Sequence, residues 1–490
     1  MVCSILVLGG GTAGFTAALT LKRLHPHLDV RVVRSPDIGI IGVGEGTNIT
    51  FTQHFIDRLK LPVPRLVSQI QPTLKLGLKL LWGPQPEFYY AFALENAVRH
   101  PSLKRANAAY LEDEPRWTGP VSALMAHEKA FHRGTDRRPR PHQNYAFHVE
   151  NHKLAAGLEV LCREQGVVIT DATVNEVQRG DEGIAGLVLA SGERLTADLY
   201  VDSSGFRSEL LGRTLGEPWI SYKSTLFCDR AVIGGWERTD EIISPYTLVE
   251  TMDAGWCWRI EHDTFINRGY VYSSAFIDDD TARAEFLRKN PKVPPDRTRV
   301  VPFVTGRFAR LWVGNVVAIG NASGFVEPLE ATAIQVICSQ SYTLANALDE
   351  AQFEMSDPMR ALYNKYNTGQ WDDIRDFLAI HYRFNTRLDT PFWQAARADT
   401  NLAGATELAE FWQMHGPCAL THGVLVNPAS AFGLEGYFAL LAGMRVPVAK
   451  PYQPTTAERT TWRSHLKALG AEAAKGCGMR ESLAALRGER

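Results

Sequence analysis

The N-terminal residues carry two hydrophobic patterns that belong to different secondary structures. Residues 3–8 form a short, continuous apolar run, which is typical of a strand buried on both faces. From residue 12 to 24 the apolar positions recur at helical spacing, with Lys22 and Arg23 on the far side. A further apolar run at residues 30–33 indicates a second strand. The pattern therefore predicts a β-α-β unit at the start of the chain.

A strict alternation follows at residues 74–80, where leucine occupies every second position. This pattern predicts one strand with a polar face. Lys75 and Lys79 would share that face, roughly 13 Å apart at ~3.3 Å per residue, so only one of them can reach a given reacting atom. Taken by themselves, both lysines are expected to be solvated strand residues.

The remaining chain divides into a strand-rich middle and a helical C-terminal part. Residues 99–143 are rich in Pro, His and Arg and predict long loops with one helix at 121–131. From Thr332 onward the pattern is mostly helical, and Thr455 or Thr456 could cap a helix over 454–469. The other expected elements are a helix at 153–164, strands at 167–170, 187–189 and 199–201, sheet over 225–277 and a buried strand at 316–319.

Composition places the chain among ordinary globular proteins. It has 490 residues, 45% of them hydrophobic, and 52 Lys and Arg against 54 Asp and Glu leave a net charge of −2. This balance gives no support for nucleic-acid binding, which usually needs clustered basic charge. Seven scattered cysteines without a C-x-x-C pair favour a reducing compartment, so a cytoplasmic location is expected. Glycines interrupt the apolar residues 2–21, and no membrane segment is expected.

The turn after the first predicted strand reads Gly9-x-Gly11-x-x-Gly14. Such glycines allow a tight turn, close approach of a pyrophosphate and close packing of helix on strand, with the helix N-terminus facing the phosphates. The acidic residue that usually binds the ribose should end the second strand, where this chain has Arg34. Arg34 could neutralise a 2′-phosphate, stack on an adenine or sit in solvent, and the last two are favoured.

Further segments, in order along residues 5–395, resemble the flavin-dependent halogenases of the tryptophan-halogenase type. They are Ile41-Gly-Val-Gly44-Glu45-Gly46-Thr47, Thr73-Leu-Lys75-Leu-Gly-Leu-Lys79, Asp202-Ser-Ser-Gly205-Phe-Arg207, Gly255-Trp256-Cys-Trp258-Arg-Ile260, Gly269-Tyr-Val-Tyr-Ser-Ser274, the loop from Gly320-Asn321 to Glu327-Pro-Leu-Glu330-Ala-Thr332, and Tyr382 through Asp389-Thr-Pro-Phe-Trp393. The W-x-W-x-I and E-P-L-E-x-T segments, in order and together with the lysine, make the resemblance specific.

The resemblance implies an α/β fold with a FAD-binding Rossmann-like (GR2-type) parallel sheet, an added antiparallel sheet and a mostly helical C-terminal region. Residues 1–335 would form the FAD-binding module with an interleaved substrate-facing sheet, and residues 336–490 would complete the substrate pocket. The implied enzyme takes reduced FAD from a separate NAD(P)H-dependent flavin reductase and uses O2 with chloride or bromide. No second Gly-x-Gly-x-x-Gly for a nicotinamide cofactor is present, in agreement with this. The oligomeric state is left open, with a homodimer as one alternative.

In the implied reaction, hypohalous acid travels through an internal tunnel to a lysine, which presents it to an electron-rich, indole-type ring. Lys75 matches that lysine, and its ammonium would hydrogen-bond the acid or, if burial lowered its pKa, form a haloamine. Glu330 matches a glutamate that polarises the electrophile or takes the ring proton. Its alternative is a helix N-terminal acid that complements the helix dipole.

The resemblance also implies binding residues for halide and cofactor. Halide would meet the backbone amides of Thr332 and Ala333, although an alanine would fit a positive φ poorly. The implied cofactor-binding residues are Gly9, Gly11, Thr12, Ala13, Gly14, Arg34, Gly44, Glu45, Gly46, Thr47, Asp202, Gly320 and Asn321.

Tyr90, Phe92, His100 and Trp393 are the implied substrate-pocket residues, and the aromatic pair could equally belong to an ordinary apolar strand. No groups that would grip an amino acid's ammonium and carboxylate stand out, so free tryptophan is not favoured over a simpler indole or a peptide-borne residue.

Trp256 and Trp258 are two residues apart and would share one face of a strand. Core packing is the ordinary explanation of such a pair, while the resemblance implies that they keep substrate away from the flavin. Glu261 stands where the family has proline. Together with Ala333, it supports the alternative function, a flavin monooxygenase or other flavin oxidoreductase on the same fold.

Overall fold

The computed structural model describes residues 1–39, 44–96, 100, 102–103, 111, 116–427 and 430–489. The chain folds into two compact units, each made of three segments that are separate in sequence. Unit 1 comprises Met1–Gln71, Val149–Ser221 and Val304–Asp372, and unit 2 comprises Pro72–His148, Tyr222–Phe303 and Asp373–Arg490. Each of the predicted ranges, 1–335 and 336–490, therefore contributes to both units.

Unit 1 is built on a six-stranded sheet in the order β10-β2-β1-β14-β23-β22. Its pairings are parallel apart from the edge strand β22, which runs antiparallel to β23. Continuous apolar sequence suits such strands because both faces are covered. The strands are β1 (Ser4–Leu8), β2 (Asp29–Arg34), β10 (Val168–Asp171), β14 (Leu199–Asp202), β22 (Trp312–Val313) and β23 (Val316–Ala318).

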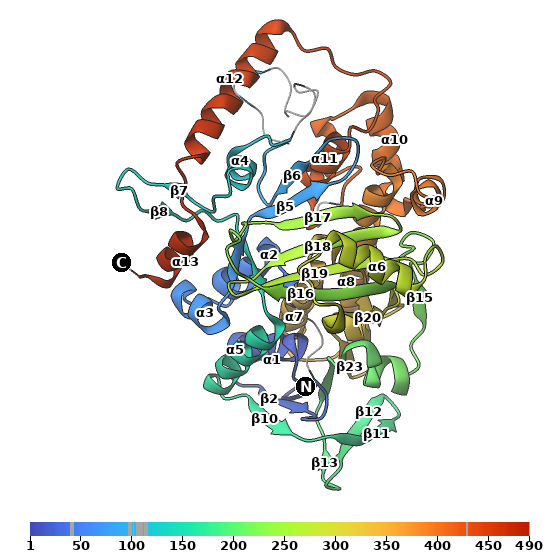
Figure 1. Ribbon diagram of the computed structural model, residues 1–490. Helices are drawn as coiled ribbons and strands as arrows, with labels where there is room; N and C mark the ends of the chain where they lie inside the picture. Colours follow the sequence, from blue (N-terminus) through green and yellow to red (C-terminus); the bar gives the residue numbers. More distant parts are fainter. Residues whose placement is uncertain are drawn as a thin grey trace. The chain divides into compact units, whose positions relative to one another are not determined.

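Helices of unit 1 pack around this sheet, and α1 contacts both α5 and α7 (Figure 1). The β-α-β unit predicted from the N-terminal pattern is present as β1, α1 and β2. The helices are α1 (Thr12–Leu24), α2 (Ile49–Thr52), α3 (Val63–Ile70), α5 (Asn151–Glu164) and α7 (Thr332–Glu350). The remaining strands are β3 (Glu45–Gly46), β11 (Val174–Gly180), β12 (Gly183–Leu189), β13 (Arg194–Leu195), β15 (Trp219–Ser221), β21 (Gly306–Phe308) and β24 (Gly324–Phe325).

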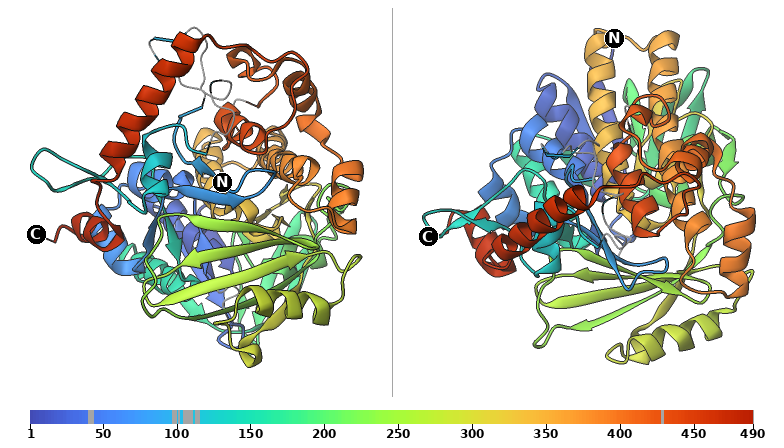
Figure 2. Two further views of the ribbon diagram at one scale, coloured as in Figure 1. Left: turned by 45° about the horizontal axis from the view of Figure 1, so that its top comes forward. Right: turned by 90° about the horizontal axis from the view of Figure 1, so that it is seen from above.

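Unit 2 contains a seven-stranded sheet in the order β20-β16-β19-β18-β17-β5-β6. Only β17 and β5 pair in parallel. Figure 2 shows α6 along one face of this sheet, where it packs against β16 and β19. The strands are β5 (Gly77–Leu81), β6 (Phe88–Ala91), β16 (Arg230–Glu237), β17 (Thr247–Met252), β18 (Gly255–Glu261), β19 (Phe265–Tyr272) and β20 (Arg299–Pro302).

The rest of unit 2 is mostly helical, as the C-terminal pattern predicts. Thr455 caps α12 through a reciprocal pair of hydrogen bonds with Glu458, which confirms one of the two predicted caps. The helix α8 (Asp357–Phe384) begins in unit 1 and ends in unit 2. The other elements are β4 (Thr73–Lys75), β7 (His132–Arg133), β8 (Pro139–Arg140), β9 (Ala146–Val149), α4 (Pro120–Ala126), α6 (Asp279–Lys289), α9 (Pro391–Asp399), α10 (Thr406–His415), α11 (Gly433–Gly443), α12 (Thr456–Ala473) and α13 (Met479–Arg487).

The prediction of one strand over residues 74–80 is wrong. The chain forms β4, which pairs with β9, and β5, which pairs with β6 and β17. Between them, the Leu76 N–H donates to the Pro245 carbonyl at 2.7 Å, so this residue belongs to neither ladder. The two halves pair with different strands, and the lysines lie in different surroundings as a result. Lys75 is completely buried, whereas Lys79 keeps 20% of its side chain exposed.

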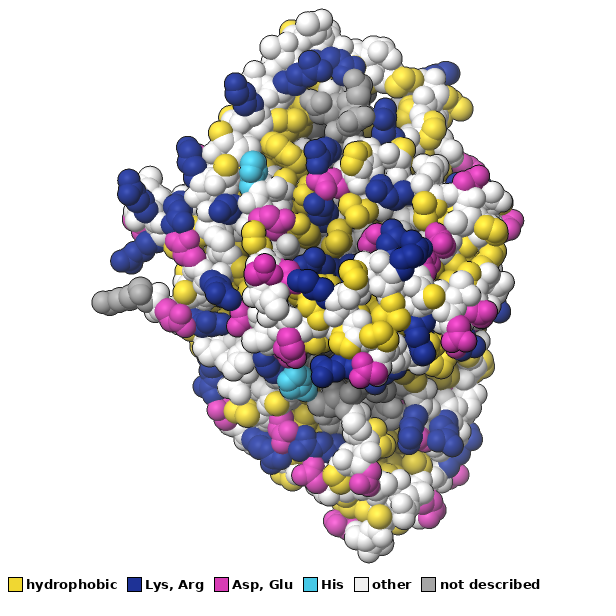
Figure 3. Space-filling view, viewed as in Figure 1, with side chains coloured by type: hydrophobic (Ala, Val, Ile, Leu, Met, Phe, Trp, Pro, Cys, Tyr) yellow, Lys and Arg dark blue, Asp and Glu magenta, His cyan; other side chains and the backbone are white. Residues whose placement is uncertain are grey.

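The predicted helix at 121–131 is correct at its start but ends early, because α4 stops at Ala126. On the face drawn in Figure 3, basic side chains lie among acidic ones, in keeping with the near-neutral charge. No helix within the described ranges is both long and apolar enough to cross a membrane.

Candidate active site

The glycine turn joins β1 to α1. Its three glycines differ in whether the surrounding structure excludes a side chain. A Cβ on Gly14 would lie 1.9 Å from the Gly9 carbonyl oxygen, and Gly9 itself has φ +121° and faces the Ser203 backbone. Both positions therefore exclude a side chain. Around Gly11, by contrast, nothing lies within 4 Å of a Cβ. That open space lies at the first turn of α1, whose leading N–H groups have no acceptor within the helix, and it suits a pyrophosphate.

Arg34, at the end of β2, is held by two carboxylates. Its Nε donates to Asp171 at 2.6 Å, and its two terminal nitrogens donate to Glu159 at 2.6 and 3.1 Å. Its side chain also fills the space beside Gly10, where a Cβ would meet Arg34 Cδ at 2.4 Å. These ion pairs raise the pKa of Arg34 and lower that of Asp171. The interpretation of Arg34 as a solvent residue is wrong, and its neutralised charge disfavours a 2′-phosphate.

The segment at Gly44 to Thr47 is well packed, while residues 41–43 of the same motif lie outside the described residues. Glu45 accepts a hydrogen bond from Asn151 Nδ2 at 2.6 Å, and burial raises its pKa. Thr47 is fully buried. The next residue, Asn48, donates to Gln335 of α7. The segment is thus fastened to both α5 and α7, and Gly46 lies within it.

Asp202, at the end of β14, is engaged by its own turn. Its carboxylate accepts hydrogen bonds from the N–H groups of Leu210 and Leu211 at 2.7 and 2.9 Å, and from Ser204. It is completely buried, and burial raises its pKa. These hydrogen bonds fix the shape of the turn that follows β14.

The loop after β23 begins at Gly320, which has φ +65°. Its N–H donates to Gln340 Oε1 at 2.8 Å, and a Cβ there would meet Ala13 of α1 and Ile337 of α7 at about 3 Å. Asn321 follows, half-buried. The glycine turn, the Gly44 segment and this loop therefore converge where α1 and α7 pack together, as one nucleotide site requires.

Glu330 and the expected halide amides lie together at the start of α7. Glu330 ends a short turn and is 1% exposed, and Thr332 and Ala333 are the first two residues of the helix. Ala331, rather than Ala333, has the positive φ, at 57°. The concern that alanine at 333 would be strained is therefore unfounded. Backbone N–H groups in the first helical turn lack intrahelical acceptors and suit an anion.

Lys75 sits in unit 2 with its whole side chain buried. Its Nζ lies 5.1 Å from the centre of the Phe92 ring, a cation–π distance. His148, diagonally across from it on β9, bonds Thr247 Oγ1 at 2.8 Å through Nε2. Burial, followed by the charge of Lys75, lowers the pKa of His148 well below its usual value. A neutral histidine beside the lysine adds no second positive charge to this buried region.

Lys79 has a different environment. Its Nζ pairs with Glu87 at 2.8 Å, and it lies 5.5 Å from the ring centre of Tyr89. Arg116 also pairs with Glu87. Both basic partners lower the pKa of Glu87 against the opposing effect of its burial. Lys79 is thus an ion-paired strand residue.

Trp256 and Trp258 share one face of β18, as predicted, with ring centres 5.9 Å apart. Both are nearly buried, and Trp258 Nε1 donates to Asn267 at 2.9 Å. Glu261, at the end of the strand, pairs with Arg238 and Arg259. The buried ion pair with Arg238 explains how a glutamate is accommodated in place of proline.

The four expected substrate residues do not form one group. Tyr90 and Phe92 meet edge to face with ring centres 6.2 Å apart. His100 instead packs on α12, 4.8 Å from the His465 ring and 6.4 Å from Trp462. Trp393 belongs to an aromatic core, where it is fully buried, stacks on Tyr382 and donates from Nε1 to the Met252 carbonyl. Of these four, Phe92 lies directly against Lys75, and Tyr90 is connected to it through Phe92.

Sequence reasoning missed the aromatic residues that continue this group. Phe377 of α8 lies 6.2 Å from Tyr90 and stacks on Phe432 at 3.9 Å between ring centres, and Tyr437 of α11 lies 5.0 Å from Phe377. Phe432 and Tyr437 stand out in the sequence as part of a Phe-Gly-Leu-Glu-Gly-Tyr-Phe run. Nothing in the pattern of α8 distinguishes Phe377 from its other buried residues.

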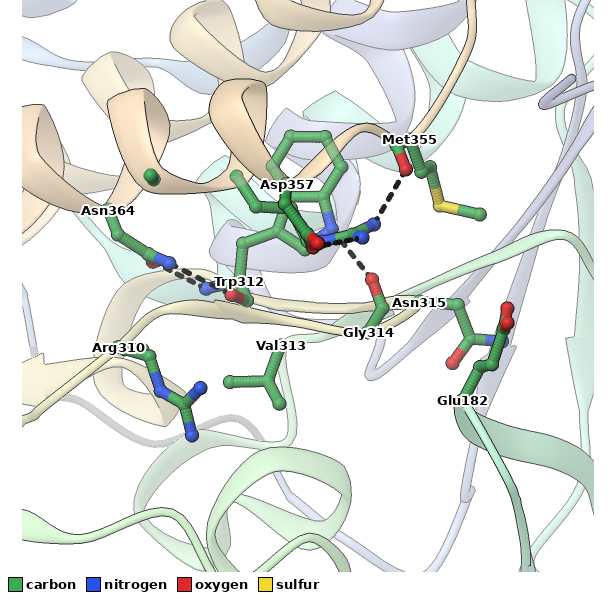
Figure 4. Close-up of a pocket in the computed structure, with 11 residues that line it drawn as sticks. Glu182, Arg310, Trp312, Val313, Gly314, Asn315, Met355, Asp357 and Asn364 are labelled. Atoms are coloured by element: carbon green, nitrogen blue, oxygen red, sulfur yellow. Dashed lines mark hydrogen bonds and ion pairs between the residues drawn. The ribbon is translucent and has the colours of Figure 1, made fainter.

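Unit 1 also contains a pocket of about 520 Å³ (Figure 4). Val313, Gly314 and Asn315 of its lining precede β23, so it lies at the amino end of the parallel strands, away from the glycine turn. Asn364 in its wall is engaged with the backbone of Trp312. Within unit 1 it is therefore separate from the glycine turn and its neighbouring segments.

Comparison with known proteins identifies the class that this fold and site represent. The chain belongs to the tryptophan halogenase family, whose sequence profile matches residues 4–461. The predicted family, fold class and enzyme class are thereby confirmed.

Several members are similar over most of their length. Tryptophan 7-halogenase RebH of Lentzea aerocolonigenes is 32% identical over 80% of this chain and 78% of its own. Tryptophan 6-halogenase ThaL of Streptomyces albogriseolus is 34% identical with the same coverage. The crystal structure of MibH, a lanthipeptide tryptophan 5-halogenase, superimposes with a TM-score of 0.88 at 36% identity, covering 100% of this chain and 94% of that one.

Proposed function

We propose that this protein is a flavin-dependent halogenase that places chloride or bromide on the indole ring of a tryptophan-type substrate. Family membership supports the reaction class, and the names of the relatives support an indole substrate. The observation that carries the proposal is Lys75, a fully buried lysine beside an aromatic side chain in the segment that resembles the family's catalytic one.

FAD is the proposed cofactor, and the open space at Gly11 supports its fit, because a group can approach the backbone there. Bound in reduced form, it would supply two electrons: reduced FAD, O2, halide and a proton yield oxidised FAD, hypohalous acid and water. Arg34 and Asp202 would support the site through their hydrogen bonds to neighbouring protein groups. The proposed binding residues are Gly9, Gly11, Thr12, Ala13, Gly14, Gly44, Glu45, Gly46, Thr47, Gly320 and Asn321.

For the halide, we propose the backbone N–H groups of Thr332 and Ala333 at the start of α7. They carry the partial positive charge of a helix N-terminus, which favours an anion. Glu330 precedes them by two residues and would accept the proton that the ring loses when halogen replaces hydrogen.

The Lys75 ammonium would donate a hydrogen bond to the hypohalous acid and hold its halogen toward the ring. Burial strengthens such a bond because no water competes for the donor. The ring then gains the halogen and loses a proton, and the oxygen leaves as water. Phe92, in contact with Lys75, would offer an aromatic surface to the substrate.

The proposed partners are an aromatic substrate and a separate NAD(P)H-dependent flavin reductase that supplies reduced FAD by diffusion. The scattered cysteines favour a reducing compartment, and the cytoplasm is the proposed location. Relatives that are named for tryptophan and for a lanthipeptide make both free and peptide-borne indoles worth testing.

The test compares Lys75→Met with the matched control Lys79→Met. The purified chain receives reduced FAD, O2 and each halide with tryptophan, indole and a tryptophan-containing peptide, and halogenated products are measured by mass spectrometry. Lys75→Met should abolish ring halogenation yet still release hypohalous acid, because the lysine acts after that acid forms. Lys79→Met should stay active, since its ammonium is engaged by Glu87.

An active Lys75→Met variant, or an inactive Lys79→Met variant that is folded, would refute the assignment. Oxygenated product formed without halide would instead favour the flavin monooxygenase alternative, for which Glu261 in place of proline is the specific observation.

A further inference from the structure

The helix α11 packs on β6 through two glycines that are seven residues apart and therefore lie on one helix face. A Cβ on Gly436 would lie 2.8 Å from the Tyr90 hydroxyl oxygen and 3.0 Å from the Phe377 ring. A Cβ on Gly443 would lie 2.3 Å from the Phe88 ring. A side chain at either position would have to displace one of these aromatic side chains, so the helix backbone packs directly on the aromatic side chains of β6.

The same helix is tied to the segment that follows β6. Glu435, in the first turn of α11, accepts hydrogen bonds from the Asn96 backbone N–H at 2.7 Å and from Asn96 Nδ2 at 2.8 Å. Both residues are buried. Hydrogen bonds to a charged carboxylate are stronger than those between neutral groups. The two bonds therefore fix the first turn of α11 to the segment that follows β6.

A chain of contacts leads from Gly436 to Lys75. The Tyr90 hydroxyl lies next to the position that a Cβ of residue 436 would occupy. The Tyr90 ring packs edge to face on Phe92, and the Lys75 ammonium lies over the Phe92 ring. All of these residues belong to unit 2. A close-packed interior passes a displacement on from one side chain to the next.

We propose that Gly436 is a specificity-determining residue: its missing side chain sets the position of Tyr90 and hence the width of the aromatic surface beside Lys75. This inference rests on the proposed halogenase function. A larger residue at 436 would push Tyr90 toward Phe92, narrow the space for an indole and turn a different ring carbon toward the Lys75 ammonium. One methyl group in an apolar pocket is enough to discriminate between substrates.

The experiment uses Gly436→Ala with Gly443→Ala as the matched control on the same helix face. In Gly436→Ala, kcat/KM for the indole substrate should fall about ten-fold and the ratio of regioisomers should change. Release of hypohalous acid should match that of the unchanged chain. Gly443→Ala should keep the original regioisomer ratio, since Phe88 is not in the contact chain to Lys75. An altered ratio in that control would mean that general loosening of α11 is responsible.

A second pair of variants keeps the inference testable if a single substitution destabilises the helix. Tyr90→Phe removes the hydroxyl oxygen that an alanine at 436 would meet, so the double variant with Gly436→Ala should recover the regioisomer ratio of Tyr90→Phe alone. Failure to recover it, or an unchanged ratio in a folded Gly436→Ala, overturns the inference. Absence of any halogenated product from the unchanged chain would instead overturn the proposed function.

Discussion

Glu95 offers a prediction whose size follows from the structure. It is 7% exposed, and its carboxylate accepts hydrogen bonds from the Val121 N–H at 2.7 Å, the Ser122 N–H at 3.2 Å and the Ser122 hydroxyl, at the start of α4. Burial, with a contribution from the charge of Glu435, raises the pKa of Glu95 to about 7, although the hydrogen bonds oppose this.

The number of protons bound by the folded and the unfolded chain decides whether stability rises or falls with pH. Between the ordinary pKa of 4.5 and the raised value of about 7, folded Glu95 holds a proton that the unfolded chain has released. Stability must therefore fall as the pH rises through this interval. At 1.36 kcal/mol per pH unit, the loss that is complete above pH 7 amounts to about 3 kcal/mol.

Glu95→Gln removes the titration but keeps one oxygen acceptor. Thermal unfolding followed from pH 4.5 to 8 should show that the variant lacks the decline of the unchanged chain and is the more stable protein at pH 8. Near pH 4.5 it should be slightly less stable, by about 1 kcal/mol for an imperfect hydrogen bond.

Glu87→Gln is the control with the opposite sign. The pKa of Glu87 is lowered by its hydrogen bonds to Lys79 and Arg116, so its carboxylate stabilises the fold above the ordinary pKa, and its loss should cost stability at neutral pH. If Glu95→Gln unfolded at a lower temperature than the unchanged chain at pH 8, the reasoning on Glu95 would be refuted.

Three further substitutions test the roles proposed for residues of unit 1. Glu330→Gln keeps shape but removes the basic oxygen, so halogenation should slow by ~10²-fold. The melting temperature should hardly move, and the reverse pattern would assign Glu330 to the helix dipole alone. Gly11→Ala has room and an ordinary φ of −91°, so it should fold normally but weaken FAD binding ~10-fold in a fluorescence titration, by intruding where the cofactor is expected. Gly14→Ala should fail to fold, and unchanged FAD affinity in Gly11→Ala would count against the site.

The sequence by itself determined the elements whose signals are local. The apolar runs at β1 and β2, the helical spacing of α1 and the glycines between them act through neighbouring residues, so the β-α-β unit is readable without any partner. The shared face of Trp256 and Trp258 follows in the same way from the period of a strand. The ordered motifs identified the family because several had to occur together.

Only the tertiary structure decided what depends on partners far away in the chain. The leucine alternation at residues 74–80 looks like one strand, but its first half pairs with β9 and its second half with β17. As a result Lys75 is buried, whereas Lys79 is partly exposed and forms an ion pair with Glu87. From the sequence alone Arg34 could contact a cofactor or sit in solvent, and only the folded structure shows its ion pairs with Glu159 of α5 and Asp171 of β10.

The glycines of α11 illustrate the same limit. In the sequence Gly436 is a weak helix residue, and only the approach of Tyr90 and Phe377 from other segments shows that a side chain there would displace its neighbours. Pairing, burial and steric exclusion are long-range properties, because each depends on surfaces that folding brings together. The local period of hydrophobic residues does not specify which surfaces will meet in the folded protein.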